Sequence, residues 1–196
     1  MSDALSFRLQ PFGGAAQQAA LGLEHVRLGG RLALERCGAE AILQIDYRLV
    51  ADLGDRPTAV QAAAPSGQPA RRDGLWQHTC LEAFLAHARG GSTAQTYWEL
   101  NLAPSGDWAL YRFAGYRSGQ HAPPLDSLPF AVHARADGLH LQLRFALPPE
   151  LAAATGLAIG ISAVLEQRNG AISHWALHHP GPEADFHRRD GFTLRC

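Results

Sequence analysis

The chain of 196 residues lacks several features on which common protein classes depend. It contains no lysine, which excludes Schiff-base catalysis and the phosphate-binding lysine of a P-loop. It has no glycine-rich nucleotide motif, and no segment approaches the roughly 20 consecutive apolar residues of a membrane-spanning helix. The formal net charge is -1, so no overall field attracts nucleic acid or an anionic membrane. We therefore expect neither as a partner.

Cysteine is also scarce. Cys37, Cys80 and Cys196 are odd in number and far apart, which disfavours a disulfide framework. The first residues lack the basic segment and apolar run of a secretory signal, so we expect a cytoplasmic protein. Hydrophobic residues make up 46% of the chain, enough for one sizeable core. We expect a single domain over residues 1–196.

Alternation of apolar and polar residues predicts strands. In residues 40–50, Leu43, Ile45 and Tyr47 share one face of a half-buried strand. Asp-Gly at 137–138 and Asn-Gly at 169–170 each predict the turn of a hairpin. Further strands are predicted over residues 5–12, 23–35, 77–87, 95–103, 107–114 and 130–145, and at the C-terminal FTLRC.

Glycine and proline mark the expected breaks between elements. Gly29-Gly30 predicts a turn between two short strands, and residues 51–73 predict a long surface loop. Residues 148–156 are the only predicted helix, with proline in the first turn and Gly156 as the C-terminal cap. About ten strands and one short helix indicate an all-β fold, an antiparallel β-sandwich or jelly roll.

Residues 74–113 concentrate the features of a binding site. They hold three of the four tryptophans and place Glu82, Glu99 and Asn101 in otherwise apolar strands. Period-two alternation puts Trp98 on one face and Glu99 and Asn101 on the other. If the two strands pair, Glu82 joins them on one surface. A polar row between aromatic residues suits a sugar, whose ring stacks on aromatic faces while its hydroxyls bind carboxylates and amides.

The same acids admit two other interpretations. They can pair with Arg112 or Arg117 and brace the sheet. Because acids rarely lie in such apolar strands, ligand binding stays open beside this structural role. Two carboxylates are also the residues that glycoside hydrolysis needs, as an acid and a base or nucleophile at set separations. No other feature marks an enzyme, so we favour a non-enzymatic protein.

Histidines gather in residues 174–187. The members of this patch are His174, His178, His179 and His187, together with Asp185. Such residues can ligate a transition metal, although their spacing matches no usual zinc signature. Pro180 and Pro182 predict a loop, and histidines in loops also bond to the backbone. Metal binding is therefore an alternative.

Three segments resemble the DOMON-like domains related to the family 9 carbohydrate-binding modules: LWQHTCLEAFL at 75–85, YWELNLAPSGDWALYRF at 97–113 and SHWALHHPGPEADFH at 173–187. The motifs are typical of a bacterial intracellular subgroup. The resemblance implies a β-sandwich jelly roll with a ligand site on one sheet face or its rim. Relatives bind carbohydrate or haem. Met1 is the only methionine, which disfavours a methionine–histidine haem site and leaves ligation by two histidines open.

We therefore expect a non-enzymatic module that binds a small molecule, with a sugar as first choice. The expected stacking platforms are Trp76 and Trp175, and the expected polar contacts are His78, Glu82, Glu99, Asn101, Arg112 and His178. The alternative is a metal- or haem-binding protein with His178, His179, Asp185 and His187 as candidate ligands. A sugar-active enzyme is the third hypothesis. No cofactor is predicted, and calcium or haem stays open.

Overall fold

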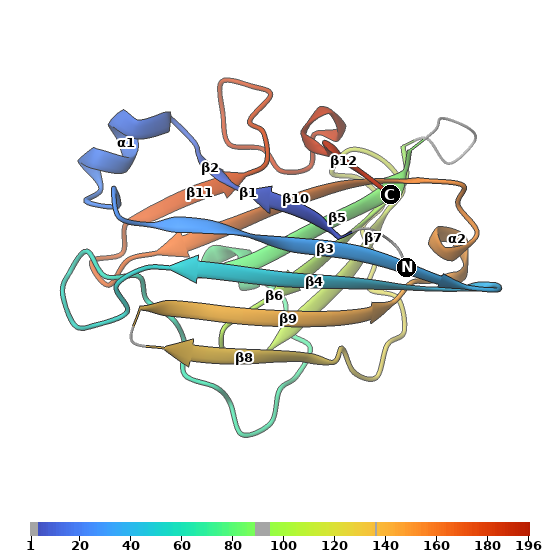
Figure 1. Cartoon of the computed structure of the whole chain (residues 1–196), viewed down its shortest axis with the longest axis horizontal. Helices are drawn as coiled ribbons and strands as arrows, with labels where there is room; N and C mark the ends of the chain where they lie inside the picture. The colour runs from blue at the N-terminus through green and yellow to red at the C-terminus, as the bar shows by residue number, and fades with distance from the viewer. Residues whose placement is uncertain (1–3, 89–94, 136) are drawn as a thin grey trace.

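The computed structural model describes residues 4–88, 95–135 and 137–196, which form two antiparallel sheets packed face to face (Figure 1). The first sheet has five strands in the order β1 (Leu5–Arg8), β3 (Arg27–Cys37), β4 (Glu40–Val50), β9 (Gly138–Ala146) and β8 (Phe130–Arg135). The second sheet has seven strands. Their order is β2 (Gln10–Pro11), β11 (Ile172–Ala176), β10 (Leu157–Glu166), β5 (Cys80–His87), β6 (Tyr97–Leu102) and β7 (Trp108–Phe113), with β12 (Leu194–Arg195) beside β10. The fold is an all-β antiparallel sandwich.

The main core lies between the two sheets, because alternation directs one set of side chains from every strand inward. Leu43 of β4, Leu100 of β6 and Ile161 of β10 belong to the same buried apolar cluster. On β4 and β9 the other set is at least partly exposed along most of the strand. On β5, β6 and β10 nearly every residue is buried, so the seven-stranded sheet is covered on both faces.

A second apolar cluster lies on the outer face of the seven-stranded sheet, under the loops that cover it. Its buried members are Phe84, Ala86, Tyr97, Ala109, Tyr111, Phe113, Ala158 and Phe192. Phe192 follows a 3₁₀ turn, Arg189–Gly191, and lies against Gly160 of β10. A Cβ at Gly160 would be 2.7 Å from Cδ1 of Phe192, so glycine allows the ring to pack on the sheet.

The predicted turn at Gly29-Gly30 is wrong. Both glycines lie inside β3, which pairs with β1 on one side and β4 on the other. A Cβ at Gly30 would be 1.8 Å from the backbone oxygen of Asp46, so the glycines serve a close approach between backbones. The chain instead turns at Gly38, between β3 and β4, where φ is 60°.

The helices also differ from the prediction. Helix α2 (Pro149–Ala152) is shorter than predicted: its C-terminal cap is Ala153 and not Gly156, which directly precedes β10. Helix α1 (Gly14–Ala20) was not predicted, since it buries no residue and therefore has no apolar periodicity. Within the described ranges, no helix has the length and apolar character needed to cross a membrane.

Candidate functional site

A cavity of about 320 Å³ lies on the covered outer face of the seven-stranded sheet. Its sheet side is formed by Glu82 and Phe84 of β5, Glu99 of β6, Phe113 of β7, Val164 of β10 and His174 of β11. Its loop side is formed by Trp76, Arg117, Gln120, Ala184, Phe186 and His187. A space of this size, with aromatic walls and a few polar groups, is typical of a small-molecule site.

Two acids lie side by side in this cavity. Strand register pairs Glu82 with Asn101 and Phe84 with Glu99, so Glu82 and Glu99 are diagonal neighbours on one face. The expected convergence of Glu82, Glu99 and Asn101 is therefore observed. Both glutamates are buried, with 2% and 5% of their surface exposed. Ser162 Oγ donates to Glu82 Oε2 at 2.9 Å, and Asn101 Nδ2 donates to Glu99 Oε1 at 2.7 Å.

This burial changes the acidity of both groups. Burial, followed by the nearby charge of Glu99, raises the pKa of Glu82 to about 8, against the hydrogen bond from Ser162. Burial raises the pKa of Glu99 to about 7, opposed by the hydrogen bond from Asn101 and the charge of Arg117. Like charges this close do not both ionise easily, so the pair shares a proton near neutral pH.

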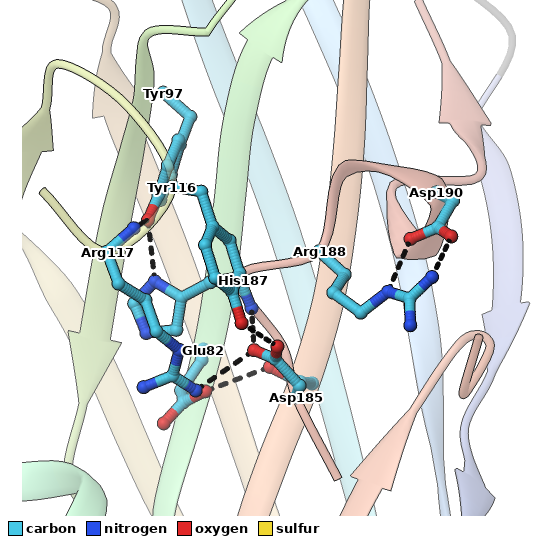
Figure 2. Close-up of polar contacts among 9 residues, drawn as sticks. Glu82, Tyr97, Tyr116, Arg117, Asp185, His187, Arg188 and Asp190 are labelled. Carbon is cyan, nitrogen blue, oxygen red and sulfur yellow. Dashed lines mark hydrogen bonds and ion pairs between the residues drawn. The ribbon is translucent and has the colours of Figure 1, made fainter. Parts of the chain in front are cut away.

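Arg117 lies on a tight turn beside the acids. Its φ is 49°, an uncommon value for a residue other than glycine, and Ser118 N donates to Gly115 O at 3.1 Å to close the turn. Figure 2 shows the side chains of Tyr116 and Arg117 converging on Asp185. Arg117 Nη2 donates to Asp185 Oδ1 at 2.9 Å, and the Tyr116 hydroxyl donates to Asp185 Oδ2. The charge of Arg117 is thus matched by Asp185.

The expected bracing of the acids by arginine is not what the contacts show. Arg112 Nε bonds instead to Glu150 Oε1, at 3.0 Å. Glu150 also accepts a hydrogen bond from Trp98 Nε1, and Trp98 belongs to the main core. Across the described ranges, neither Glu82 nor Glu99 forms an ion pair.

His187 borders the cavity as a neutral ring. Burial and the charge of Arg117 lower its pKa to about 4, against the attraction of Asp185. Its Nδ1 lies 2.7 Å from the Tyr97 hydroxyl, which also accepts from Arg117 N at 3.2 Å (Figure 2). The single hydroxyl proton of Tyr97 therefore points to Nδ1, and the ring proton is assigned to Nε2.

Trp76 is the exposed aromatic residue of the cavity. It belongs to a 3₁₀ turn, Leu75–Gln77, directly before β5, and 40% of its surface is exposed. Its ring packs edge to face on Tyr111 at a centroid distance of 6.0 Å. Phe84, Phe113 and Phe186 add further rings. The site therefore offers apolar ring surfaces beside carboxyl groups.

Other expected contact residues lie away from this cavity. Trp175 is 2% exposed and packs in the main core, where its Nε1 donates to Ser173 Oγ at 3.0 Å. The ring does not face the cavity, because alternation on β11 directs His174 to the cavity and Trp175 inward. His78 is exposed and bonds to Glu166 Oε2 at 2.9 Å, outside the cavity.

Two more expected contacts have a different place. Asn101 is fully buried and orients Glu99 instead of lining the cavity. His178 borders a separate, smaller hollow beside Phe192. Of the expected contacts, the cavity thus brings together Trp76, Glu82 and Glu99.

The histidine patch does not converge on one point. His179 Nε2 bonds to the backbone oxygen of Gln10 at 3.0 Å, whereas His187 bonds to Tyr97. Asp185 is engaged by Arg117 and Tyr116. In the part of the chain that the structure describes, no group of three or more His, Cys, Asp or Glu side chains is placed to hold a metal ion.

Sequence reasoning missed several residues of the cavity as ligand contacts. Phe84 and Phe113 were within its reach, because alternation places Phe84 on the same face as Glu82. Arg117, Gln120 and Phe186 lie in loops, where no periodicity marks a shared surface. Their place depends on contacts between distant segments, such as Arg117 with Asp185.

No protein-family model and no curated protein matches the chain. Among solved structures, the chain is similar to a family 9 carbohydrate-binding module from Caldicellulosiruptor kristjanssonii in complex with cellotriose. The TM-score is 0.43 and the sequence identity 12%, over 80% of this chain and 68% of that chain. This likeness assigns neither a ligand nor a site to the chain.

Proposed function

We propose that the chain is a non-enzymatic, carbohydrate-binding-like module whose ligand occupies the cavity over β5, β6 and β10. One observation carries the proposal: the half-exposed ring of Trp76 and the buried carboxyl groups of Glu82 and Glu99 line the same cavity. A sugar presents C–H groups to an aromatic face and hydroxyls to carboxyl groups. A cavity of about 320 Å³ suits a small sugar.

The polar groups of the cavity match the hydrogen-bonding capacity of hydroxyls. Glu99 offers an accepting oxygen, and a protonated Glu82 offers a donor. Gln120 supplies both a donor and an acceptor, and His187 supplies its Nε2–H. Because a hydroxyl both donates and accepts, each of these groups can be satisfied by one sugar ring.

In this proposal, the chain acts as one domain over residues 1–196, a DOMON-like relative of the family 9 modules from the bacterial intracellular subgroup. Its setting is the cytoplasm. Cys37, Cys80 and Cys196 are all free thiols, which suits a reducing compartment. A small soluble sugar, or one derived from the cell wall, is available there.

Calorimetry with a panel of mono- and disaccharides tests the proposal. We expect binding that Trp76→Ala and Glu99→Gln each weaken by about 1–3 kcal/mol, because each removes a direct contact. Val50→Ala is the control, since Val50 is 47% exposed on β4 of the other sheet. Absence of heat with every sugar at millimolar concentration would refute the proposal.

The acid pair also supports a second candidate, a sugar-active enzyme. Glu82 and Glu99 lie on the same face of the sheet, and burial raises the pKa of both. Glu82 would then protonate a leaving group while Glu99 acts as base or nucleophile. Chromatography of a bound oligosaccharide after incubation separates the two candidates. Products that disappear in Glu82→Gln favour the enzyme, and unchanged sugar favours the module.

A further inference from the structure

The acids of the cavity point to a particular class of sugar. We infer that the ligand is an amino sugar whose protonated amine lies between Glu82 and Glu99. This inference rests on the proposed function and specifies its ligand. It is carried by three observations: unused oxygens on two buried carboxyl groups, a nearby arginine that is already paired, and aromatic rings around the same space.

Among the residues that the structure describes, each carboxyl group keeps one oxygen without a hydrogen-bond partner. Ser162 bonds to Oε2 of Glu82 and Asn101 bonds to Oε1 of Glu99. The other oxygen of each receives no hydrogen bond from any residue that the structure describes. Both side chains are more than nine-tenths buried, and both line the cavity. A buried carboxylate is costly unless it is paired, and an ammonium group has three N–H donors to pair it.

The positive groups near the acids do not fill this role. Arg117 Nη2 lies 2.9 Å from Asp185 Oδ1 and is paired there. His174 and His187 are neutral at pH 7, because burial lowers the pKa of both rings. Arg117 lowers the pKa of Glu99 through its charge, yet among the described residues neither Glu82 nor Glu99 forms an ion pair with a cation.

The remaining titratable neighbours add no positive charge. Burial, together with the charge of Glu82 or Glu99, raises the pKa of four neighbouring groups, so these groups stay neutral at pH 7: Tyr47, Cys80, Tyr97 and Tyr111. Asp73 accepts a hydrogen bond from the Tyr111 hydroxyl and is a further acid near the site. Apart from Arg117, which Asp185 pairs, a ligand cation would therefore meet only neutral or acidic groups among these neighbours.

Aromatic rings surround the same space. Trp76, Phe84, Phe113 and Phe186 all line the cavity. The negative face of an aromatic ring attracts an ammonium group, and the attraction grows where water is excluded. Rings and carboxyl groups together therefore favour a cation, whereas a neutral sugar uses the rings only to stack its C–H groups. This difference turns the inference into a measurable preference.

Calorimetry at pH 7 with four probes tests it: D-glucosamine, D-glucose, N-acetyl-D-glucosamine and cyclohexylamine. We expect D-glucosamine to bind at least ~10-fold more tightly than either neutral sugar, because charged hydrogen bonds replace neutral ones. Binding of the ammonium ionises both carboxyl groups, so the shared proton leaves to the solvent. The measured heat of D-glucosamine should then change between buffers of different protonation enthalpy, and that of D-glucose should not.

Three variants complete the test. Glu82→Gln and Glu99→Gln should each reduce the ratio of D-glucosamine to D-glucose affinity toward one. Glu166→Gln is the matched control, because Glu166 bonds to His78 outside the cavity, and it should keep the ratio. Circular dichroism confirms the fold of each variant. If a variant does not fold, the inference is still tested by the wild-type ratio of D-glucosamine to D-glucose affinity and by the proton release.

The failures are distinguishable. Equal affinity for D-glucosamine and D-glucose would overturn the amine inference and leave the sugar-binding proposal standing. If cyclohexylamine binds and no sugar does, the cavity is an ammonium site, and the proposal that its ligand is a sugar is overturned. Binding of none of the probes would overturn the inference together with the ammonium site.

Discussion

The outer faces of the two sheets differ in what covers them. On the five-stranded sheet, β4 alternates between buried core residues and a face that water reaches, where Arg48 is exposed. On the seven-stranded sheet, β5 is buried along both faces up to its last residue. Loops and the segment that ends at Phe192 cover that outer face and enclose the cavity. On this covered face, Glu82 and Glu99 lie out of the solvent.

This difference shows on which face a polar residue indicates a ligand site. An acid on the open face, such as Asp46, bonds to His140 and Gln142 and is at least partly exposed. Glu82 on the covered face is 2% exposed, and among the described residues its side chain accepts one hydrogen bond, from Ser162. Because such burial is costly, its presence points to a ligand more strongly than an exposed acid does.

The largest expected contrast between the two faces comes from Phe84→Ala. Phe84 is 1% exposed, and its ring packs on Phe192 at 5.6 Å and on His187 at 5.3 Å. Its removal leaves a cavity between the sheet and its cover, so urea unfolding should show a loss of about 3–5 kcal/mol. Arg48→Ala on β4 should change stability by less than about 0.5 kcal/mol. Equal effects would mean that the covered face is not a second core.

The next contrast concerns pH. The folded-state pKa of Glu82 is raised to about 8 from an ordinary value of 4.5, mainly by burial. A carboxyl group with a raised pKa stabilises the folded state fully below its unfolded value. That contribution is lost as pH rises through the folded value. Thermal and urea unfolding should therefore show that this contribution to the stability of the wild type is lost between pH 5 and pH 8.

Glu82→Gln removes this ionisation and keeps the shape of the side chain. The free energy of unfolding of the variant should rise relative to that of the wild type, by on the order of 2–4 kcal/mol between pH 5 and pH 8. His187 titrates in both proteins, so its contribution cancels in the difference. Glu35→Gln, at an exposed position of β3, is the matched control. A difference between Glu82→Gln and wild type that is constant over this range would contradict the expectation.

Alternation predicted the faces of the strands well. It separated Trp98 in the core from Glu99 on the outer face, and it anticipated that Glu82 would join Glu99. The Asn-Gly pair at 169–170 correctly marked the turn between β10 and β11, where Gly170 has a φ of 84°. Turn chemistry and period-two patterns are local, so one sequence is enough to recognise them.

The remaining errors have a common physical cause. The sequence around Trp175 does not show which face of β11 the ring occupies, and pairing with β10 turns it inward. Arg117 meets Asp185 across 68 residues of sequence, which no local signal encodes. Gly29-Gly30 has the composition of a turn, but neighbouring backbones require it inside a strand. Each error concerns contacts between distant segments.

The smallest expected contrast compares two tyrosine hydroxyls at the site. Tyr97 is buried, and its hydroxyl accepts from Arg117 N and bonds to Nδ1 of the neutral His187. Tyr97→Phe leaves both groups without this partner, so unfolding in urea should show a loss of about 1–2 kcal/mol. Tyr116 is 58% exposed, and water can replace its hydroxyl at Asp185, so Tyr116→Phe should cost less than about 0.5 kcal/mol. Similar losses for the two variants would show that the cover over the sheet excludes water no better than the open surface does.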